Sequence, residues 1–245
     1  MTDTMKKFLL PLAALAMLAG CNHFTTEVYQ DNLTMAICED CEDSLTFNLS
    51  VEYVTGGMSA DAMDLLNRYI VYNAFDLEEF DAPLAETAEY YREGLMEYYL
   101  NECAEAGMTS SWEDDTDAYF LPDWKGWKNY MIRYYSYRGG AHGIQTESYL
   151  VFDAKTGELL KEPDLFKEGY EDPLMDMLRM CVSDSLPFDE EMSEMLWLQN
   201  VVPNGNFFLD KEGITWSYQP YEVGPYALGI VTATLSWDEL KPYLK

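Results

Sequence analysis

Residues 45–53 alternate strictly between apolar and polar side chains, and this period-two pattern constrains the fold more than any other feature of the chain. Its apolar members are Leu45, Phe47, Leu49, Val51 and Tyr53. Because successive side chains of a β-strand point to opposite faces of a sheet, an alternating segment predicts a half-buried strand. Residues 130–137 and 144–152 lie on either side of a glycine-rich break, and their aromatic and β-branched residues predict two more strands.

Helical patterns are interspersed among these strands. Ser59 is placed to cap one helix, Asp81 and Pro83 open a longer one, and Asp172 opens a third. Helices and strands that do not strictly alternate favour an α+β class. We therefore expect a twisted antiparallel sheet packed with helices, preceded by a smaller α/β subdomain.

Residues 112–123 are acidic and aromatic, and they are predicted to form a loop. The run 113–117 lacks the glycine and the distal glutamate that a calcium-binding loop uses. It is interpreted as a solvated run of charge, and neither a metal nor a cofactor is expected.

The first 21 residues follow the pattern of a bacterial lipoprotein signal. Lys6 and Lys7 supply the positive start, residues 8–17 are apolar, and small residues lead to Cys21. The apolar run is shorter than the roughly 20 residues of a membrane-spanning helix. We expect residues 1–20 to be removed, Cys21 to carry lipid, and residues 21–44 to form a polar tether. Asn22 is not the aspartate that favours inner-membrane retention in enteric bacteria, so the expected location is the cell envelope, at the outer membrane.

The charge of the chain is strongly negative. It holds 44 acidic and 15 basic side chains, for a net charge of -29. A field of this sign repels nucleic acid and attracts cationic proteins or metal ions. Nucleic acid is therefore excluded as an expected partner.

Four cysteines remain beside Cys21, and an exported protein with this number favours disulfides. They are Cys38, Cys41, Cys103 and Cys181. Their pairing stays open, as does the alternative that Cys103 and Cys181 are buried free thiols. A redox pair at Cys38 and Cys41 is a weaker interpretation, because the two carboxylates between the thiols would disfavour the thiolate. A zinc site is also weaker, because the spacing does not bring Cys103 and Cys181 to the same point.

A set of spaced motifs follows in order from Trp127 to the C-terminus. The motifs are residues 135–143 (Tyr-Ser-Tyr-Arg-Gly-Gly-Ala-His-Gly), 151–153, 155–157, 164–166, 213–218, 221–227 and 240–244. This set resembles the C-terminal domain of unknown function shared by the anti-sigma factor RsiV and the peptidoglycan deacetylase PdaC. The resemblance implies such a domain over residues 126–245, with residues 45–125 as a small α/β partner domain.

What the resemblance implies is an extracytoplasmic binding or sensing module, since the RsiV domain is a receptor for lysozyme. The sigma-binding segment of RsiV and the deacetylase domain of PdaC have no counterpart here, so those two activities do not carry over. The expected protein is a lipid-anchored envelope protein that recognises a cationic protein such as lysozyme, and it is not an enzyme.

Tyr137, Gly139, Gly140 and His142 form the candidate binding motif. Gly139 and Gly140 are expected to adopt backbone angles closed to other residues, with His142 bonded to neighbouring strands. The alternative is a cell-wall hydrolase that uses His142 as its base, but no spacing names a nucleophile or an orienting carboxylate.

A second alternative is binding of peptidoglycan or another glycan. Tyr137, Trp112, Trp124 and Trp127 are the aromatic residues that would stack on sugar rings. In a chain that is 15% aromatic, rings at strand spacing more often belong to a core or a sheet face.

Lipid attachment at Cys21 is directly testable. Cells given a clickable palmitate analogue should label the wild-type chain and leave Cys21→Ala unlabelled, because acylation needs the thiol. Equal labelling of the two chains would contradict the assignment.

Overall fold

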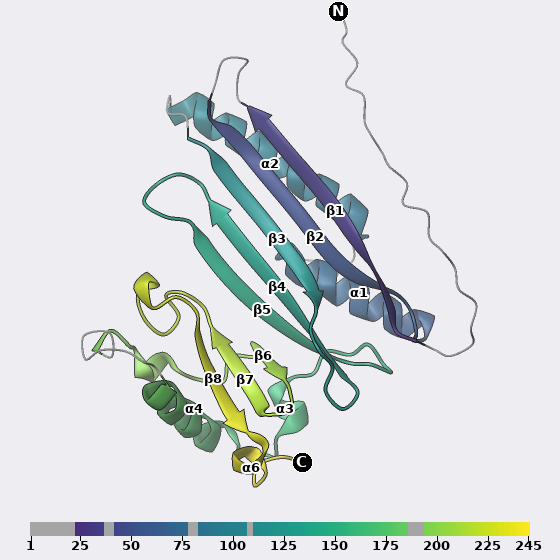
Figure 1. Ribbon diagram of the computed structural model, residues 1–245, viewed down its shortest axis with the longest axis vertical. Coiled ribbons are helices and arrows are strands. Elements are labelled where there is room, and N and C mark those ends of the chain that lie inside the picture. The colour runs from purple at the N-terminus through teal and green to yellow at the C-terminus, as the bar shows by residue number, and fades with distance from the viewer. Residues whose placement is uncertain (1–22, 37–41, 78–82, 107–109, 186–193) are drawn as a thin grey trace, which may run out of the picture.

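The computed structural model describes residues 23–36, 42–77, 83–106, 110–185 and 194–245, which form a mixed α+β fold (Figure 1). One sheet has the strand order β1-β2-β3-β4-β5 and the other has the order β6-β7-β8. In chain order the helices and strands are β1 (Thr25–Ala36), β2 (Ser44–Gly56), α1 (Ala60–Ala74), α2 (Leu84–Ala106), β3 (Trp112–Phe120), β4 (Trp127–Tyr137), β5 (Ile144–Asp153), α3 (Glu162–Leu165), α4 (Glu171–Ser185), β6 (Phe207–Leu209), β7 (Gly213–Tyr218), β8 (Val231–Ser236) and α6 (Trp237–Leu240). The predicted α+β class is confirmed.

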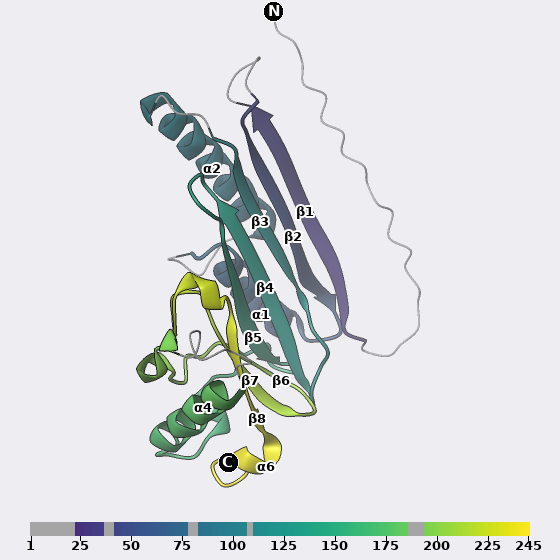
Figure 2. The ribbon, with the colours of Figure 1, turned by 60° about the vertical axis from the view of Figure 1, so that its left-hand side comes forward.

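The larger sheet is mixed because β2 and β3 run parallel while its other neighbours run antiparallel. A parallel pair needs a crossover, and α1 and α2 make it. Figure 2 shows both helices on the same face of the sheet. The Ser59 side chain caps α1 as predicted, by accepting from the Ala62 amide. Among the described residues, no helix combines the length and apolar composition that a membrane span requires.

The helix-covered face of the larger sheet holds the first hydrophobic core. The first four alternating apolar residues of β2 are buried there, as the sequence pattern predicts, whereas the fifth, Tyr53, is only partly buried. They pack with residues of both helices, and the cluster includes Leu45, Phe47, Leu49, Val51, Leu66, Ile70, Ala88, Leu95 and Tyr99.

A second core lies between the smaller sheet and α4, which packs against β8 (Figure 1). Strand β5 belongs to both cores, since Leu150 and Phe152 lie in the first and Val151 lies in the second. Asn129 of β4, only 1% exposed, also joins the two sheets. Its side chain donates to the Leu209 carbonyl at 2.7 Å and accepts from the Leu209 amide at 2.9 Å.

Side-chain amides occupy the edge of β5. Gln219 accepts from the Glu147 amide at 2.8 Å and donates to the Glu147 carbonyl at 2.6 Å. Asn206 accepts from the Tyr149 amide at 2.7 Å. These amides bond to the strand as a neighbouring backbone would, which blunts an edge that otherwise invites pairing. They also fix the start of the loop that follows β7.

The predicted tether over residues 21–44 is wrong for residues 25–36, which form β1. On its inward face Asp31 interrupts the apolar period, so the strand pattern is hidden in the sequence. Arg92 of α2 pairs with Asp31 and offsets the charge. Leu33 on the same face packs against the first core.

The predicted single antiparallel sheet after Trp127 is wrong in its extent. Strands β4 and β5 continue the larger sheet through β3, and the predicted helix at Asp172 packs on the separate smaller sheet. A domain boundary between residues 125 and 126 would fall between β3 and β4, which pair along eight positions from Glu113 to Phe120. Strand β5, within the predicted second domain, contributes to both cores.

Candidate functional site

A carboxylate lies buried between the larger sheet and α2. Asp114 of β3 is 1% exposed and accepts three hydrogen bonds. Tyr134 Oη donates at 2.8 Å, Arg138 Nη2 at 2.9 Å and Tyr91 Oη at 3.3 Å. Burial, followed by the charge of Asp114, raises the pKa of Tyr91, so its hydroxyl stays protonated as a donor. One carboxylate thus ties together β3, β4, α2 and the first residue after β4.

Arg138 is held on two further sides. Its Nε donates to Ser136 Oγ at 3.1 Å. Its guanidinium lies 5.4 Å from the Trp112 ring centre and 5.7 Å from that of Tyr98, within the range of cation–π attraction. Burial alone would lower the pKa of Arg138, but the hydrogen bond to Asp114 raises it, so the guanidinium stays charged.

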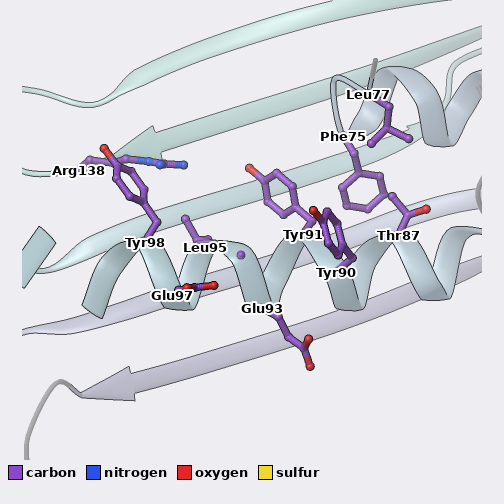
Figure 3. Close-up of a pocket in the computed structure, with 11 residues that line it drawn as sticks. Phe75, Leu77, Thr87, Tyr90, Tyr91, Glu93, Leu95, Glu97, Tyr98 and Arg138 are labelled. Carbon is purple, nitrogen blue, oxygen red and sulfur yellow. The ribbon is translucent and has the colours of Figure 1, made fainter. Parts of the chain in front are cut away.

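A groove of about 530 Å³ runs along α2 and ends at this arginine (Figure 3). Aromatic and aliphatic side chains form most of its lining, and carboxylates contribute to it. Its residues are Phe75, Leu77, Thr87, Tyr90, Tyr91, Glu93, Gly94, Leu95, Glu97, Tyr98 and Arg138. Its volume falls in the range of small-molecule sites.

Strand β3 places further acids on the opposite face of the sheet, which we call the polar face. Because Asp114 points towards α2, Glu113 and Asp115 point away from it. Asn48 donates to Asp115 at 2.7 Å. Partial burial and the neighbouring Asp115 raise the pKa of Glu113. Neither Glu113 nor Asp115 forms an ion pair within the described residues.

His142 lies on a tyrosine. Its ring stacks on that of Tyr226 at 3.8 Å between centres and 15° between planes, and Nδ1 donates to the Gly143 carbonyl at 2.9 Å. Tyr226 Oη donates to the same carbonyl at 2.8 Å. Within the described part of the chain, no recorded bond joins His142 to a carboxylate that would orient it as a base.

The stack around His142 adjoins the acids of the polar face through Tyr135. A Cβ added at Gly143 would lie 2.6 Å from the Tyr135 ring. Burial raises the pKa of Tyr135, and the charges of Glu113 and Asp115 add to the rise. We call this area the tyrosine–acid surface, and it consists of Glu113, Asp115, Tyr135, Tyr137, His142, Tyr221 and Tyr226.

The predicted binding motif therefore lies at this surface. Gly139 and Gly140 have φ of 83° and 96°, a backbone region that side chains rarely adopt, as the sequence predicts. Tyr137 Oη donates to the Gly140 carbonyl at 3.1 Å and closes the turn. The motif holds Arg138 on the helix side of the sheet and His142 on the other.

The predicted loop over residues 112–123 is wrong for β3. Sequence reasoning missed Asp114 because a charged residue occupies the inward, apolar face of that strand. The usable signal was the alternation of Trp112, Thr116 and Ala118 with acids.

The three tryptophans considered for sugar stacking lie elsewhere. Trp112 is 7% exposed and lies against Arg138. Trp124 and Trp127 pack against the second core, where Trp124 stacks on Trp237.

Cys103 is a free thiol packed on the first core, and Cys181 packs on the second core with its thiol donating to the Thr234 carbonyl. They therefore do not bridge each other. Cys21, Cys38 and Cys41 lie outside the described residues, so their lipidation and oxidation stay predictions. The described ranges hold no group of three or more His, Cys, Asp or Glu side chains suited to a metal ion.

Comparison with known proteins finds a match to a family model over part of the chain and a shared fold. Residues 163–238 match the model of a family described as a protein of unknown function, DUF3298. A solved DUF3298 family member from Bacteroides fragilis is similar over 91% of this chain and 94% of its own, with a TM-score of 0.78 and 23% identity. A DUF3298 family protein from Pseudomonas aeruginosa has a TM-score of 0.67 and 15% identity, covering 91% and 95%. No curated protein matches the chain. At these identities the likeness shows the fold.

The coupling of Asp114 to Arg138 can be measured by a double-mutant cycle in urea. Arg138→Met should lower the free energy of unfolding by about 3 kcal/mol, because it removes the ion partner of a buried carboxylate. Asp114→Asn should cost less, since Arg138 is partly hydrated. The double variant should lose about 1–3 kcal/mol less than the sum.

The exposed pair Asp64 and Arg68, one helical turn apart, is the matched control. Its coupling should be about 0.5 kcal/mol or less. Additive losses at Asp114 and Arg138 would contradict the proposed network.

Proposed function

We propose that this chain is a lipid-anchored protein of the cell envelope that binds a cationic protein through the tyrosine–acid surface, with a lysozyme-like muramidase as the leading partner. The observation that carries the proposal is the pair Glu113 and Asp115, whose charges have no ion partner within the described residues. The two acids lie beside the half-buried Tyr137 and Tyr135 of the neighbouring strand. The net charge of -29 acts in the same direction over a longer range.

Charge and tyrosine have different effects in such an interface. An acidic field speeds encounter with a basic partner and makes binding sensitive to salt, because exposed charges are screened over about 8 Å at physiological ionic strength. Tyrosine rings supply large contact areas with little side-chain entropy to lose, and they are common among the residues that dominate binding energy. Tyr221, 52% exposed, and the stacked Tyr226 are placed for this role.

The resemblance to the RsiV domain supports the choice of lysozyme independently of charge. A hydrolase acting through His142 has less support, because its recorded bond is to a backbone carbonyl rather than to a carboxylate. The lipoprotein-signal pattern that ends at Cys21 supports the envelope location.

The proposal predicts how removal of charge changes affinity. The full chain carrying Glu113→Gln and Asp115→Asn should bind lysozyme about tenfold more weakly at low salt, the sum of two exposed ion pairs. As a control, Glu168→Gln with Asp176→Asn removes the same charge from exposed positions before and within α4. This control should change the affinity for lysozyme by about twofold or less. Calorimetric titration at two salt concentrations measures both.

The pH dependence has a definite sign. The pKa of Glu113 is raised, so on acidification this carboxylate loses its charge at a higher pH than an ordinary glutamate does. The affinity for lysozyme should therefore begin to fall at that higher pH as the solution is made more acidic.

Equal affinity of wild type and the Glu113/Asp115 variant would contradict the proposal. Turnover of peptidoglycan fragments that a folded His142→Ala abolishes would favour the hydrolase.

A further inference from the structure

Helix α2 has a glycine in the middle of its exposed face. Gly94 lies well inside the 23 residues of this helix, where glycine is among the least favourable residues. A Cβ built there would meet no atom within 4 Å, so packing does not require glycine. Its φ is not in the left-handed region either. Neither packing nor backbone geometry therefore requires glycine here. What the glycine does provide is open space over this part of the helix.

Two exposed tyrosines border that space. Tyr90 and Tyr98 lie four residues before and after Gly94, on the same side of the helix. They are 79% and 48% exposed, unusual for such large rings. At 1.5 Å per residue their positions are about 12 Å apart along the axis. All three residues line one groove, and we call them the saddle. Figure 3 shows the rings of Tyr90 and Tyr98, which lie on either side of Gly94 in the helix.

The groove beneath the saddle combines an apolar floor with polar groups of both signs. Phe75, Leu95 and Tyr91 line the floor, Glu93 and Glu97 supply acceptors, and Arg138 stands at the Tyr98 end. Arg138 uses Nε and Nη2 within the protein, and its Nη1 carries no hydrogen bond to the described residues. The Arg138 side chain is 35% exposed, so its guanidinium can donate to a ligand in the groove.

We propose that this groove binds an uncharged oligosaccharide. Exposed flat rings suit the apolar faces of sugars, while carboxylates and a guanidinium suit hydroxyl and acetamido groups. An anionic ligand would meet Glu93, Glu97 and the acidic chain, so charge excludes that class. Among the others, the two exposed aromatic rings favour a sugar over a basic peptide, which would need the carboxylates alone. The separation of the two rings favours more than one sugar unit.

Gly94→Leu fills the saddle and tests this directly. In titration of the full chain with the tetramer of β-1,4-linked N-acetylglucosamine, affinity should fall at least tenfold. Helix propensity favours leucine over glycine, so the melting temperature should be unchanged or higher, which excludes unfolding as the cause. Tyr90→Ala should weaken binding similarly, and Tyr221→Ala, an exposed tyrosine on the tyrosine–acid surface, should not.

Unchanged affinity in Gly94→Leu, or no binding by the wild type at millimolar tetramer, would overturn the proposal. Salt-dependent binding of oligolysine that Gly94→Leu abolishes would assign the groove to a basic peptide instead. Gly94→Leu should still bind lysozyme, so failure of the glycan site and failure of the proposed function are distinguishable.

Discussion

The buried carboxylate of Asp114 is the constraint on which the rest of the architecture depends. A charge removed from water is costly unless it is paired and hydrogen-bonded, and here two hydroxyls and a guanidinium do both. These donors come from α2 and from β4 and the residue after it, so the same interaction sets the helix against the sheet. It also holds Arg138 at the end of the groove. The glycine turn that follows Arg138 places His142 on the polar face.

Side-chain amides give the second constraint. Gln219 and Asn206 bond to the edge of β5 as another strand would, and they hold the smaller sheet and the loop after β7 in place. That loop carries Tyr221 and Tyr226. The stack on His142 therefore depends on contacts between residues 57 and 72 positions apart in the sequence. The polar face and the groove are separate surfaces because β3 alternates acid outward and acid inward.

Much of the fold could be predicted from the sequence, because periodicity reports burial. Residues 45–53, the cap at Ser59 and the strands on either side of residues 138–143 all follow simple patterns, and the structure confirms them. The two strands that were missed share one physical cause. Asp31 in β1 and Asp114 in β3 are charged residues on inward faces, and the partners that neutralise them, Arg92 and Arg138, are distant in sequence.

The candidate site was predictable in part for the same reason. The glycines at 139 and 140 predict a turn, so residues 137–142 could be identified from the sequence. Tyr226 and Glu113 could not be joined to them, because the amide contacts to β5 and the parallel pairing of β2 with β3 leave no local signal. The groove could not be predicted either, because it forms only where α2 packs beside Phe75, Leu77 and Arg138. An exposed glycine between two tyrosines does not by itself indicate a groove.

Hydrogen exchange of the full chain, with and without lysozyme, most directly tests the claim that the polar side of the sheet is the protein-binding side. The account predicts slower exchange in residues 138–143 and 219–228 and unchanged exchange in α2. Slower exchange confined to α2, or to the smaller sheet and α4, would contradict it.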